Sequence, residues 1–379
     1  MSWLALKMLT GDRAKFVGLI FGVAFSTLLM AQQVSVFIGI VKRSASQIYD
    51  VRDADIWVMD NKVRFIDEAP GLPDSDLLRV RGVEGVDWAV KLYKGQVRAR
   101  LEDGNFRNVM LHGLDDASLV GAPVDFVAGS LADLRRPNAV IVDENGYHYM
   151  WPGEPIQIGR EFEMNDRRAV LVGVCKVSAP FTTLPVLYTR YNEARHYVPR
   201  ERNLMNFVLA KPAEGFTADQ VAEKIEASTG LMALSKEGFV VKTIKYFLSS
   251  TGIPVNFGIT ISLGFIVGAA VAGQTFYLFT IENLKQFGSL KAMGVSNLRI
   301  AGMILLQAWF VGLLGYGIGI GLSALFFEAT ANIPHLAGIF MGWQAMTGVG
   351  LAVGMIVALA GMLSMRRVWV LEPAVVFRG

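Results

Sequence analysis

Side chains that could catalyse a reaction or hold a metal are sparse in this chain of 379 residues. Cys175 is the only cysteine, so no internal disulfide can form and a zinc site that needs several cysteines is excluded. The four histidines, at positions 112, 148, 196 and 335, follow no spacing typical of metal ligands. We therefore expect no metal and no cofactor in this chain.

The short motifs of common enzymes are missing as well. No Gly-Lys dipeptide occurs, so the chain has no P-loop to bind the phosphates of ATP. The sequence contains neither a Gly-x-Ser-x-Gly nucleophile elbow nor a His-Glu-x-x-His zinc motif, and its acidic residues are scattered. The net charge of +3 is small and gives no reason to expect a nucleic-acid partner. The chain is predicted not to be an enzyme by itself.

The chain is organised around one polar segment, residues 281–300, between two long apolar stretches. No Asp, Glu, Lys or Arg occurs between Lys245 and Glu282, or between Arg299 and Glu328. The segment itself carries three basic residues and one acid. A short, net basic loop between two membrane spans is expected on the cytoplasmic side.

This segment predicts a short helix from about Glu282 to Met293. Gly294 suits the position just after a helix, and Ser296 suits the N-cap of the next one. Apolar residues recur at every third position, a spacing that drifts by about 60° per step on a regular helix. We therefore expect a break near Gly288, or a helix contacted on several sides. The apolar residues are Ile281, Leu284, Phe287, Leu290 and Met293.

The elements that must position this segment are membrane spans. The chain is 53% hydrophobic and only 18% charged, whereas about a quarter of the residues of a soluble protein are charged. We predict an α-helical membrane protein with four transmembrane helices and a large mixed α+β extracytoplasmic domain inserted between helices 1 and 2. The predicted parts are an interfacial helix (1–15), span one (16–41), the periplasmic domain (42–252, with a middle lobe at about 112–195), span two (253–280), the polar segment (281–299), span three (300–327), a short periplasmic loop (328–342), span four (343–365) and a cytoplasmic tail (366–379).

Basic residues set the predicted orientation, with both termini in the cytoplasm of a bacterial cell and the chain crossing its inner membrane. Arg366 and Arg367 follow the fourth span directly. Lys42 and Arg43 oppose this orientation, but the rule weakens when a long domain follows. Residues 16–41 are too long for the apolar core of a cleavable signal peptide, which favours an uncleaved anchor.

Local patterns predict several elements of the inserted domain. Residues 217–228 read as a helix capped by Thr217, and Phe239 to Thr243 as a strand. Glu102 to Asn105 reads as the turn of a hairpin. Pro180 to Pro185 is predicted to be an exposed loop, either an ordinary turn or a contact surface.

Glycines spaced by four mark predicted packing faces in the spans, because small residues let helix backbones approach closely in lipid. They are Gly18 and Gly22, Gly264 and Gly268, Gly315 and Gly319, and Gly350 and Gly354. Packing within one subunit and pairing with a second copy both remain open. Ionisable residues are absent from the span centres, which argues against a proton- or ion-coupled transporter.

On physical grounds alone, two interpretations of the polar segment stay open: a tight turn whose lysines set the orientation, or a segment that does more than connect two spans. The run from Glu282 to Ser296 carries Gly288, Leu290, Lys291, Ala292, Gly294 and Ser296. With these residues at matching positions, it resembles the cytoplasmic coupling segment of FtsX-like, MacB-type ABC transporter permeases. The family usually has Glu at the position of Gln286. A salt bridge from this position therefore does not carry over, although Gln286 could still form a hydrogen bond. The ending Leu371 to Arg378 also resembles the C-terminal signature of the family. The coupling residues that the resemblance implies are Glu282, Lys285, Gln286, Phe287, Gly288, Leu290, Lys291, Ala292, Met293, Gly294 and Ser296.

The resemblance implies the permease subunit of an exporter, similar to the stand-alone DevC-like group. Its partners would be a separate ABC ATPase dimer that binds ATP and Mg, a second copy of this chain, a periplasmic membrane-fusion adaptor, an outer-membrane channel and membrane lipid. ATP-driven closure of the ATPases would push on residues 282–296 and on the N-terminal helix, and this mechanotransmission would expel substrate from the periplasm. Alternatives are a lipoprotein-releasing permease, an exporter of haem or antimicrobial peptides, and an FtsX-type signalling protein that activates a cell-wall hydrolase.

Overall fold

The computed structural model describes residues 2–198, 204–331, 333 and 339–369. The chain divides into two compact units. The helical unit comprises residues 1–39, 252–332 and 339–379, and the inserted domain comprises residues 40–251 and 333–338. The C-terminal signature at 371–378 and most of residues 332–338 lie outside the described residues.

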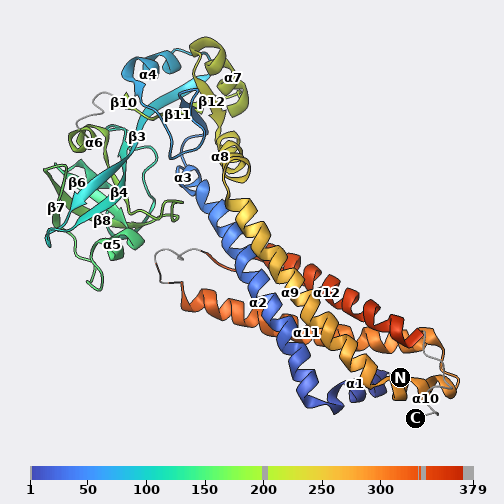
Figure 1. The fold of residues 1–379 in the computed structure, drawn as a ribbon. Helices are drawn as coiled ribbons and strands as arrows, with labels where there is room; N and C mark the ends of the chain where they lie inside the picture. The colour runs from blue at the N-terminus through green and yellow to red at the C-terminus, as the bar shows by residue number, and fades with distance from the viewer. Residues whose placement is uncertain (1, 199–203, 332, 334–338, 370–379) are drawn as a thin grey trace. The chain divides into compact units, whose positions relative to one another are not determined.

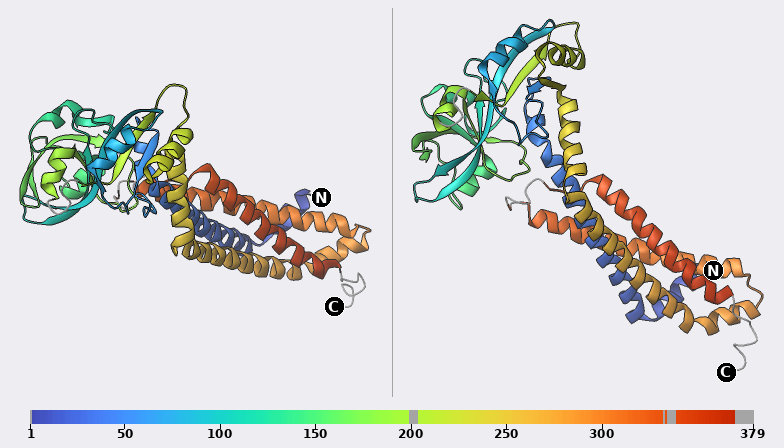
Figure 2. Two further views of the ribbon diagram at one scale, coloured as in Figure 1. Left: turned by 90° about the horizontal axis from the view of Figure 1, so that it is seen from above. Right: turned by 45° about the horizontal axis from the view of Figure 1, so that its top comes forward.

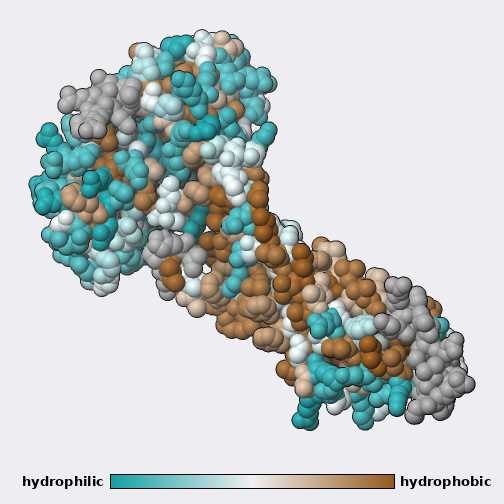
Figure 3. All heavy atoms as spheres, in the orientation of Figure 1, coloured by the Kyte–Doolittle hydropathy of each residue, from teal (hydrophilic) through white to brown (hydrophobic). Residues whose placement is uncertain are grey.

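The helical unit contains long apolar helices (Figures 1 and 2). Its helices are α1 (Ser2–Gly11), α2 (Arg13–Ser44), α9 (Ile253–Glu282), α10 (Leu284–Ala292), α11 (Asn297–Ala329) and α12 (Trp343–Trp369). Four stretches in the described part of the chain are long and apolar enough to cross a membrane: Arg13–Ser44, Ile253–Glu282, Asn297–Ala329 and Trp343–Met365. Figure 3 shows brown, hydrophobic side chains over most of this unit and teal, hydrophilic ones over most of the inserted domain.

Small residues hold α2 against its neighbours within the helical unit. On α9, the Ser26 hydroxyl donates to the carbonyl of Gly264 at 2.8 Å, and Gly268 lies against the same serine. On α11, a Cβ atom at Gly319 would lie 2.5 Å from the Cβ of Thr27. Small residues permit this close approach of helix backbones in a membrane.

The other predicted glycines lie in different surroundings. A Cβ at Gly22 would meet Val271, and one at Gly315 would meet Val23. Gly350 and Gly354 of α12 lie opposite the aromatic rings of Tyr316 and Trp309, at ordinary contact distance. Gly18 is exposed and has no such neighbour within 4 Å among the described residues.

The inserted domain is built on one large mixed sheet flanked by short helices. The strands are β1 (Ile56–Met59), β2 (Leu72–Pro73), β3 (Val86–Arg100), β4 (Phe106–Leu114), β5 (Asp125–Gly129), β6 (Ala139–Asp143), β7 (Glu161–Met164), β8 (Arg167–Lys176), β9 (Val186–Arg190), β10 (Leu204–Met205), β11 (Phe207–Pro212) and β12 (Met232–Ser235). The helices are α3 (Ser46–Asp50), α4 (Asp74–Arg81), η1 (Leu131–Arg135), α5 (Glu144–Met150), α6 (Tyr191–Tyr197), α7 (Ala218–Thr229) and α8 (Lys236–Ser250).

Strand pairing divides the domain into two lobes that share β3. One lobe is the sheet β12-β1-β11-β3, whose pairs are all antiparallel. The other lobe is a closed circuit in which β3, β4, β9, β6, β8 and β7 pair in turn and β7 returns to β3. We call this circuit the barrel. It contains two parallel pairs, β4 with β9 and β6 with β8. β6, Ala139–Asp143, is buried along its whole length, as a continuous apolar strand should be.

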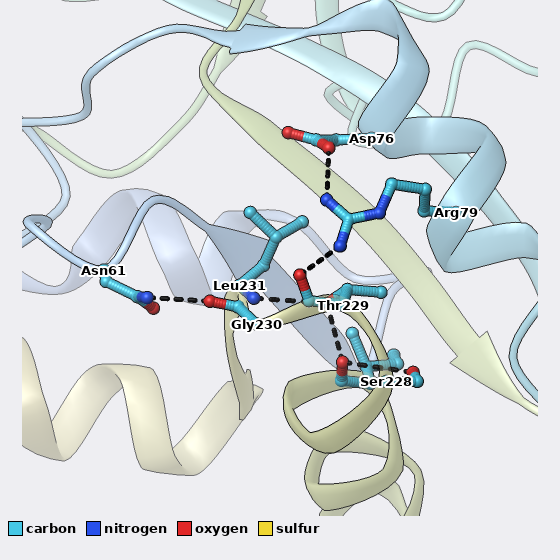
Figure 4. A network of polar contacts seen from close by, with 8 residues as sticks. Asn61, Asp76, Arg79, Ser228, Thr229, Gly230 and Leu231 are labelled. Carbon is cyan, nitrogen blue, oxygen red and sulfur yellow. Dashed lines mark hydrogen bonds and ion pairs between the residues drawn. The ribbon is translucent and has the colours of Figure 1, made fainter.

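The predicted helix at 217–228 is confirmed as α7. Thr217 accepts the backbone N–H of Gln220, and the Gln220 side chain accepts the N–H of Thr217 in return, which completes a capping box. Gly230, at φ +70°, ends the helix in the left-handed conformation. The Arg79 guanidinium bonds the carbonyl of Thr229 and also donates to Asp76 at 2.9 Å, so α4 and α7 are linked (Figure 4).

Two local predictions for the inserted domain are wrong. Phe239 to Thr243 lies inside helix α8, not in a strand. The segment Pro180 to Pro185 is a loop, but it is not exposed: Pro180 and Pro185 are buried and the residues between them are half-buried. The predicted hairpin turn is confirmed, because β3 and β4 pair up to Arg100 and Phe106 around it.

Candidate functional site

The polar segment folds into α10, a separate helix between two spans. The apolar pattern predicted either a break near Gly288 or a helix contacted on several sides. The helix breaks at Asn283, and Gly288 is buried within α10. Asn283 leaves the helical conformation at φ −90° and ψ 8°. Its side-chain amide donates to the carbonyl of Phe279 at 2.8 Å, and its own carbonyl accepts the N–H of Phe287 at 3.0 Å. Asn283 therefore ends α9 and starts α10 in another direction.

Gly294 ends α10 where the sequence predicts it. With φ at +89°, it adopts the left-handed conformation that glycine adopts most easily. The N–H of Gly294 donates to Lys291 at 2.9 Å, and the N–H of Val295 donates to Leu290 at 3.0 Å, the two bonds of a Schellman motif. Ser296 is the N-cap residue of α11, although its side chain makes no capping hydrogen bond. The turn between α10 and α11 is thus well defined.

One face of α10 is buried in a small core, which we call the basal core. Phe287 is fully buried in it, and Leu290 nearly so. The core joins α1, α10, the start of α11 and the end of α12. Its buried members are Ala5, Phe287, Leu290, Ile300, Ala301, Met303, Ile304, Met365 and Val368.

Polar side chains tie the same helices together. The Lys291 ammonium donates to the carbonyl of Val368 at 2.7 Å, close to the C-terminus of α12, where a cation is favourable. The amide of Gln307, buried in α11, donates to the carbonyl of Ala5 in α1 at 2.7 Å. Sequence reasoning did not assign these contacts, although a glutamine inside an apolar span is a signal for such a partner.

An ion-paired cluster lies where α1 meets α2. Lys15 bonds Glu282 and lies 2.8 Å from a carboxylate oxygen of Asp12. Asp12 also accepts the backbone N–H of Lys15 at 3.2 Å. The Lys15 ammonium, hydrogen-bonded to Asp12, holds the pKa of that carboxyl below its ordinary value. Glu282, the acid of the predicted coupling segment, thus connects the end of α9 to the start of α2.

The opposite face of α10 is exposed. Met293 is 72% exposed and Leu298, just beyond the turn, is 82% exposed. Around them lie exposed polar or small residues of the segment: Lys285, Gln286, Ser289, Ala292, Gly294 and Ser296. We call Met293, Leu298 and these residues the basal surface. Large apolar side chains with a polar rim are typical of a protein contact.

Two family models match this chain. The FtsX-like permease C-terminal model matches residues 243–373, which include α10, and the MacB-like periplasmic core domain model matches residues 16–228, more than half of the chain. The chain belongs to the FtsX-like, MacB-type ABC transporter permeases. It is therefore a permease that works with an ABC ATPase, in a membrane that its four apolar helices cross, with the inserted domain on the extracytoplasmic side.

Relatives along nearly the whole chain agree with this family. An uncharacterised ABC transporter permease of Methanocaldococcus jannaschii is 20% identical over 389 residues, covering 99% of this chain and 96% of its own. One of Mycobacterium tuberculosis is 23% identical over 368 residues, covering 96% and 93%.

Solved structures resemble the inserted domain only at low scores. The periplasmic region of MacB from Actinobacillus actinomycetemcomitans matches with a TM-score of 0.39 and 13% identity, covering 54% of this chain and 96% of its own. The extracellular domain of the transporter YknZ from Gram-positive bacteria matches with a TM-score of 0.36 and 15% identity, covering 48% and 98%. Scores this low add nothing to the family assignment.

The structure also bears on metal binding and on the predicted coupling residues of the permease. Among the described residues, no group of three or more His, Cys, Asp or Glu side chains could hold a metal ion. The predicted coupling residues separate by role. The buried residues of α10 are Phe287, Gly288 and Leu290, and Lys291 donates a hydrogen bond to α12. The other predicted coupling residues lie on the exposed face or at its ends. α10 is therefore packed against α1, α11 and α12 on its buried face.

Proposed function

We propose that this permease is the membrane subunit of a MacB-type exporter that transmits ATP-driven movement of a separate ATPase dimer to the inserted domain. The observation that carries the proposal is the division of α10 into a buried face and an exposed one. Phe287 and Leu290 bind the helix into the basal core, while Met293 and Leu298 remain free to contact a partner. The basal surface is the docking site for the ATPase.

Charge supports a cytoplasmic position for the basal surface. Lys285, Lys291 and Arg299 lie in or beside the segment, and Arg13 and Lys15 lie at the start of α2. Between Arg299 and Arg366 the sequence contains no lysine or arginine, so the loop joining α11 to α12 lacks positive charge. By the positive-inside rule, α10 and both termini face the cytoplasm.

Rigid helices provide a route for the movement. A push on α10 acts on α12 through Lys291 and on α1 through the basal core. α9 extends without interruption from Glu282 back to Ile253, and only Thr251 and Gly252 separate it from α8 of the inserted domain. Because only two residues separate the two helices, movement of α9 displaces α8 of the inserted domain. Substrate is then expelled from the periplasmic side through an adaptor and an outer-membrane channel, with two copies of the permease in the complex.

The test is ATP hydrolysis by the permease reconstituted with its ATPase in lipid. We expect Met293→Asp combined with Leu298→Asp to lower permease-dependent ATPase activity at least tenfold, because two charges enter the apolar centre of the docking site. The matched control is Leu78→Asp, an apolar residue of the inserted domain that is 67% exposed. The control should stay within twofold of the unsubstituted permease. Full activity of the double variant would refute the docking site.

A further inference from the structure

The loop between β8 and β9, residues 177–185, contacts both segments through which the inserted domain joins the spans. α3 follows the first span directly, and α8 precedes the second. Both segments already contribute to the core beneath the loop, which includes Ile48 of α3, Phe239 of α8 and Val186 of β9. The loop adds specific polar and aromatic contacts to this shared core.

Contacts to α3 hold the start of the loop. The Asp50 carboxylate accepts the backbone N–H of Ser178 at 3.0 Å and its hydroxyl at 2.9 Å. The hydroxyl of Ser46 donates to the carbonyl of Ala179 at 3.1 Å. Three hydrogen bonds therefore join two neighbouring loop residues to one short helix.

A contact to α8 holds the middle of the loop. The ring of Phe181 lies 4.5 Å, centroid to centroid, from the ring of Phe247, one turn before α8 ends. Phe247 in turn packs edge-on against Phe65 at 5.3 Å, and Tyr246 stacks on Phe65 at 4.6 Å. Such aromatic pairs add about 0.5–1.5 kcal/mol beyond burial alone.

Bonds to the barrel hold the end of the loop. The buried Asp143 carboxylate accepts the N–H of Val186 at 2.7 Å and that of Gly146, at the start of α5, at 2.9 Å. The carbonyl of Pro185 accepts the N–H of Met110 in β4 at 2.8 Å. The loop is thus fastened at one end to the barrel and elsewhere to α3 and α8.

The loop has a strained conformation that the surrounding contacts must maintain. Thr183 has a φ of +53°, which is unfavourable for a β-branched residue. The hydroxyl of Thr182 is buried without a hydrogen-bond partner in the described part of the chain. Strained residues persist only where the surrounding structure holds them, so the contacts to α3, α8 and the barrel keep the loop in this conformation.

We propose that residues 177–185 form a strap that makes the barrel follow α3 and α8 when these segments move. This inference rests on the proposed function for the source of the movement, but the fastening itself is a property of this chain alone. The strap adds a few specific side-chain contacts to the shared core, so single substitutions should loosen the attachment of the barrel to the two segments without unfolding either lobe.

The experiment measures the distance between spin labels on the barrel and on α8 in the full chain in lipid nanodiscs. Labels are attached at His148→Cys in α5 and Lys245→Cys in α8, both exposed positions, while the buried Cys175 stays in place. We expect one narrow distance distribution for the unsubstituted strap. Phe181→Ala and Asp50→Asn, made separately, should each broaden the distribution at least twofold, and Phe181→Tyr should keep it narrow.

The matched control is Phe106→Ala, which removes an exposed ring of the same domain. It should leave the distribution narrow. Slow hydrogen exchange of the β6 amides must persist in each strap variant, which shows that the barrel is still folded. A narrow distribution in both Phe181→Ala and Asp50→Asn would overturn the strap. With the ATPase added, failure of the chain to support ATP hydrolysis would overturn the proposed function, while the distances measured on the chain alone would still decide about the strap.

Discussion

At the scale of single residues, the chemistry of this permease lies in a few buried polar groups. His112 of β4 lies opposite Lys94 of β3 and Tyr188 of β9 in the strand register, and its ring is 5.2 Å from the tyrosine ring. Burial, with a smaller effect of the Lys94 charge, lowers the pKa of His112 to about 3. His112 is therefore neutral in the folded domain.

This shift makes the inserted domain sensitive to acid. The unfolded chain binds a proton at His112 below about pH 6.5, whereas the folded domain does not bind it until about pH 3. Above pH 6.5, His112 is neutral in both states and does not lower the free energy of unfolding. As the pH falls below 6.5, protonation of the unfolded chain lowers the free energy of unfolding. We expect His112→Phe to reduce the loss by about 1.4 kcal/mol per pH unit between pH 6 and 5. The free energy of unfolding at each pH is measured from the hydrogen exchange of the slowest β4 amides.

The titration of Asp143 has the opposite effect on the stability of the folded domain, and the two effects must be separated. Burial raises the pKa of its carboxyl to about 6, so its unfavourable ionisation in the folded state is relieved as the pH falls from 6 toward 3.8. His112→Phe must therefore be compared with the unsubstituted chain at each pH. Parallel pH profiles for the two proteins would contradict the assignment to His112.

Sequence reasoning placed the residues of the polar segment correctly where local rules decide. Gly294 takes the left-handed conformation and Ser296 starts the next helix, because both positions depend on neighbours in sequence. The break was expected near Gly288 but occurs at Asn283, whose side chain bonds the preceding turn. The apolar pattern was compatible with a break or with a helix contacted on several sides, and it did not fix where a break would lie. The contact of Gln307 with Ala5 joins residues far apart in sequence, so no local pattern could predict it.

At the scale of elements, the long helices follow from apolar length and the short ones from their caps. The misassigned segment Phe239 to Thr243 shows where β-propensity misleads. Its aromatic and β-branched residues favour a strand, yet Ser235 caps α8 by accepting the N–H of Gly238 at 3.2 Å. A buried face then keeps the segment helical. Glycine spacing likewise predicted close approach, but only the fold shows which neighbour each glycine meets.

Helix packing in the spans can be tested with two glycines of α11. Gly319→Leu would place side-chain atoms where Thr27 and the carbonyl of Ala24 already lie, whereas Gly317 has nothing within 4 Å in the described structure. We expect Gly319→Leu to lower the unfolding temperature in detergent by roughly 5 °C, since overpacking costs about 1–3 kcal/mol. Gly317→Leu, the control, should change it by less than about 1 °C. Equal shifts in the two variants would argue against the contact between α2 and α11.

At the scale of the whole molecule, the long apolar stretches predicted four spans and a large insertion, and the resemblance of the polar segment to a family's coupling segment implied a permease. The barrel was not predictable. Its closure depends on β7 meeting β3 through only two residue pairs, Ala99 with Met164 and Arg100 with Glu163, which lie more than sixty residues apart in sequence. The strap was missed for a similar reason, because Phe181 and Phe247 come together only in the folded domain.

The most direct test of the central claim is site-specific photo-crosslinking from the basal surface. A photoreactive amino acid replaces Met293 in the permease assembled with its ATPase in lipid, and the same amino acid at Leu78 serves as the control. The account predicts a covalent product between the permease and the ATPase from position 293 and none from position 78. An intact complex that gives no product from position 293 would contradict the claim that α10 receives the movement of the ATPase.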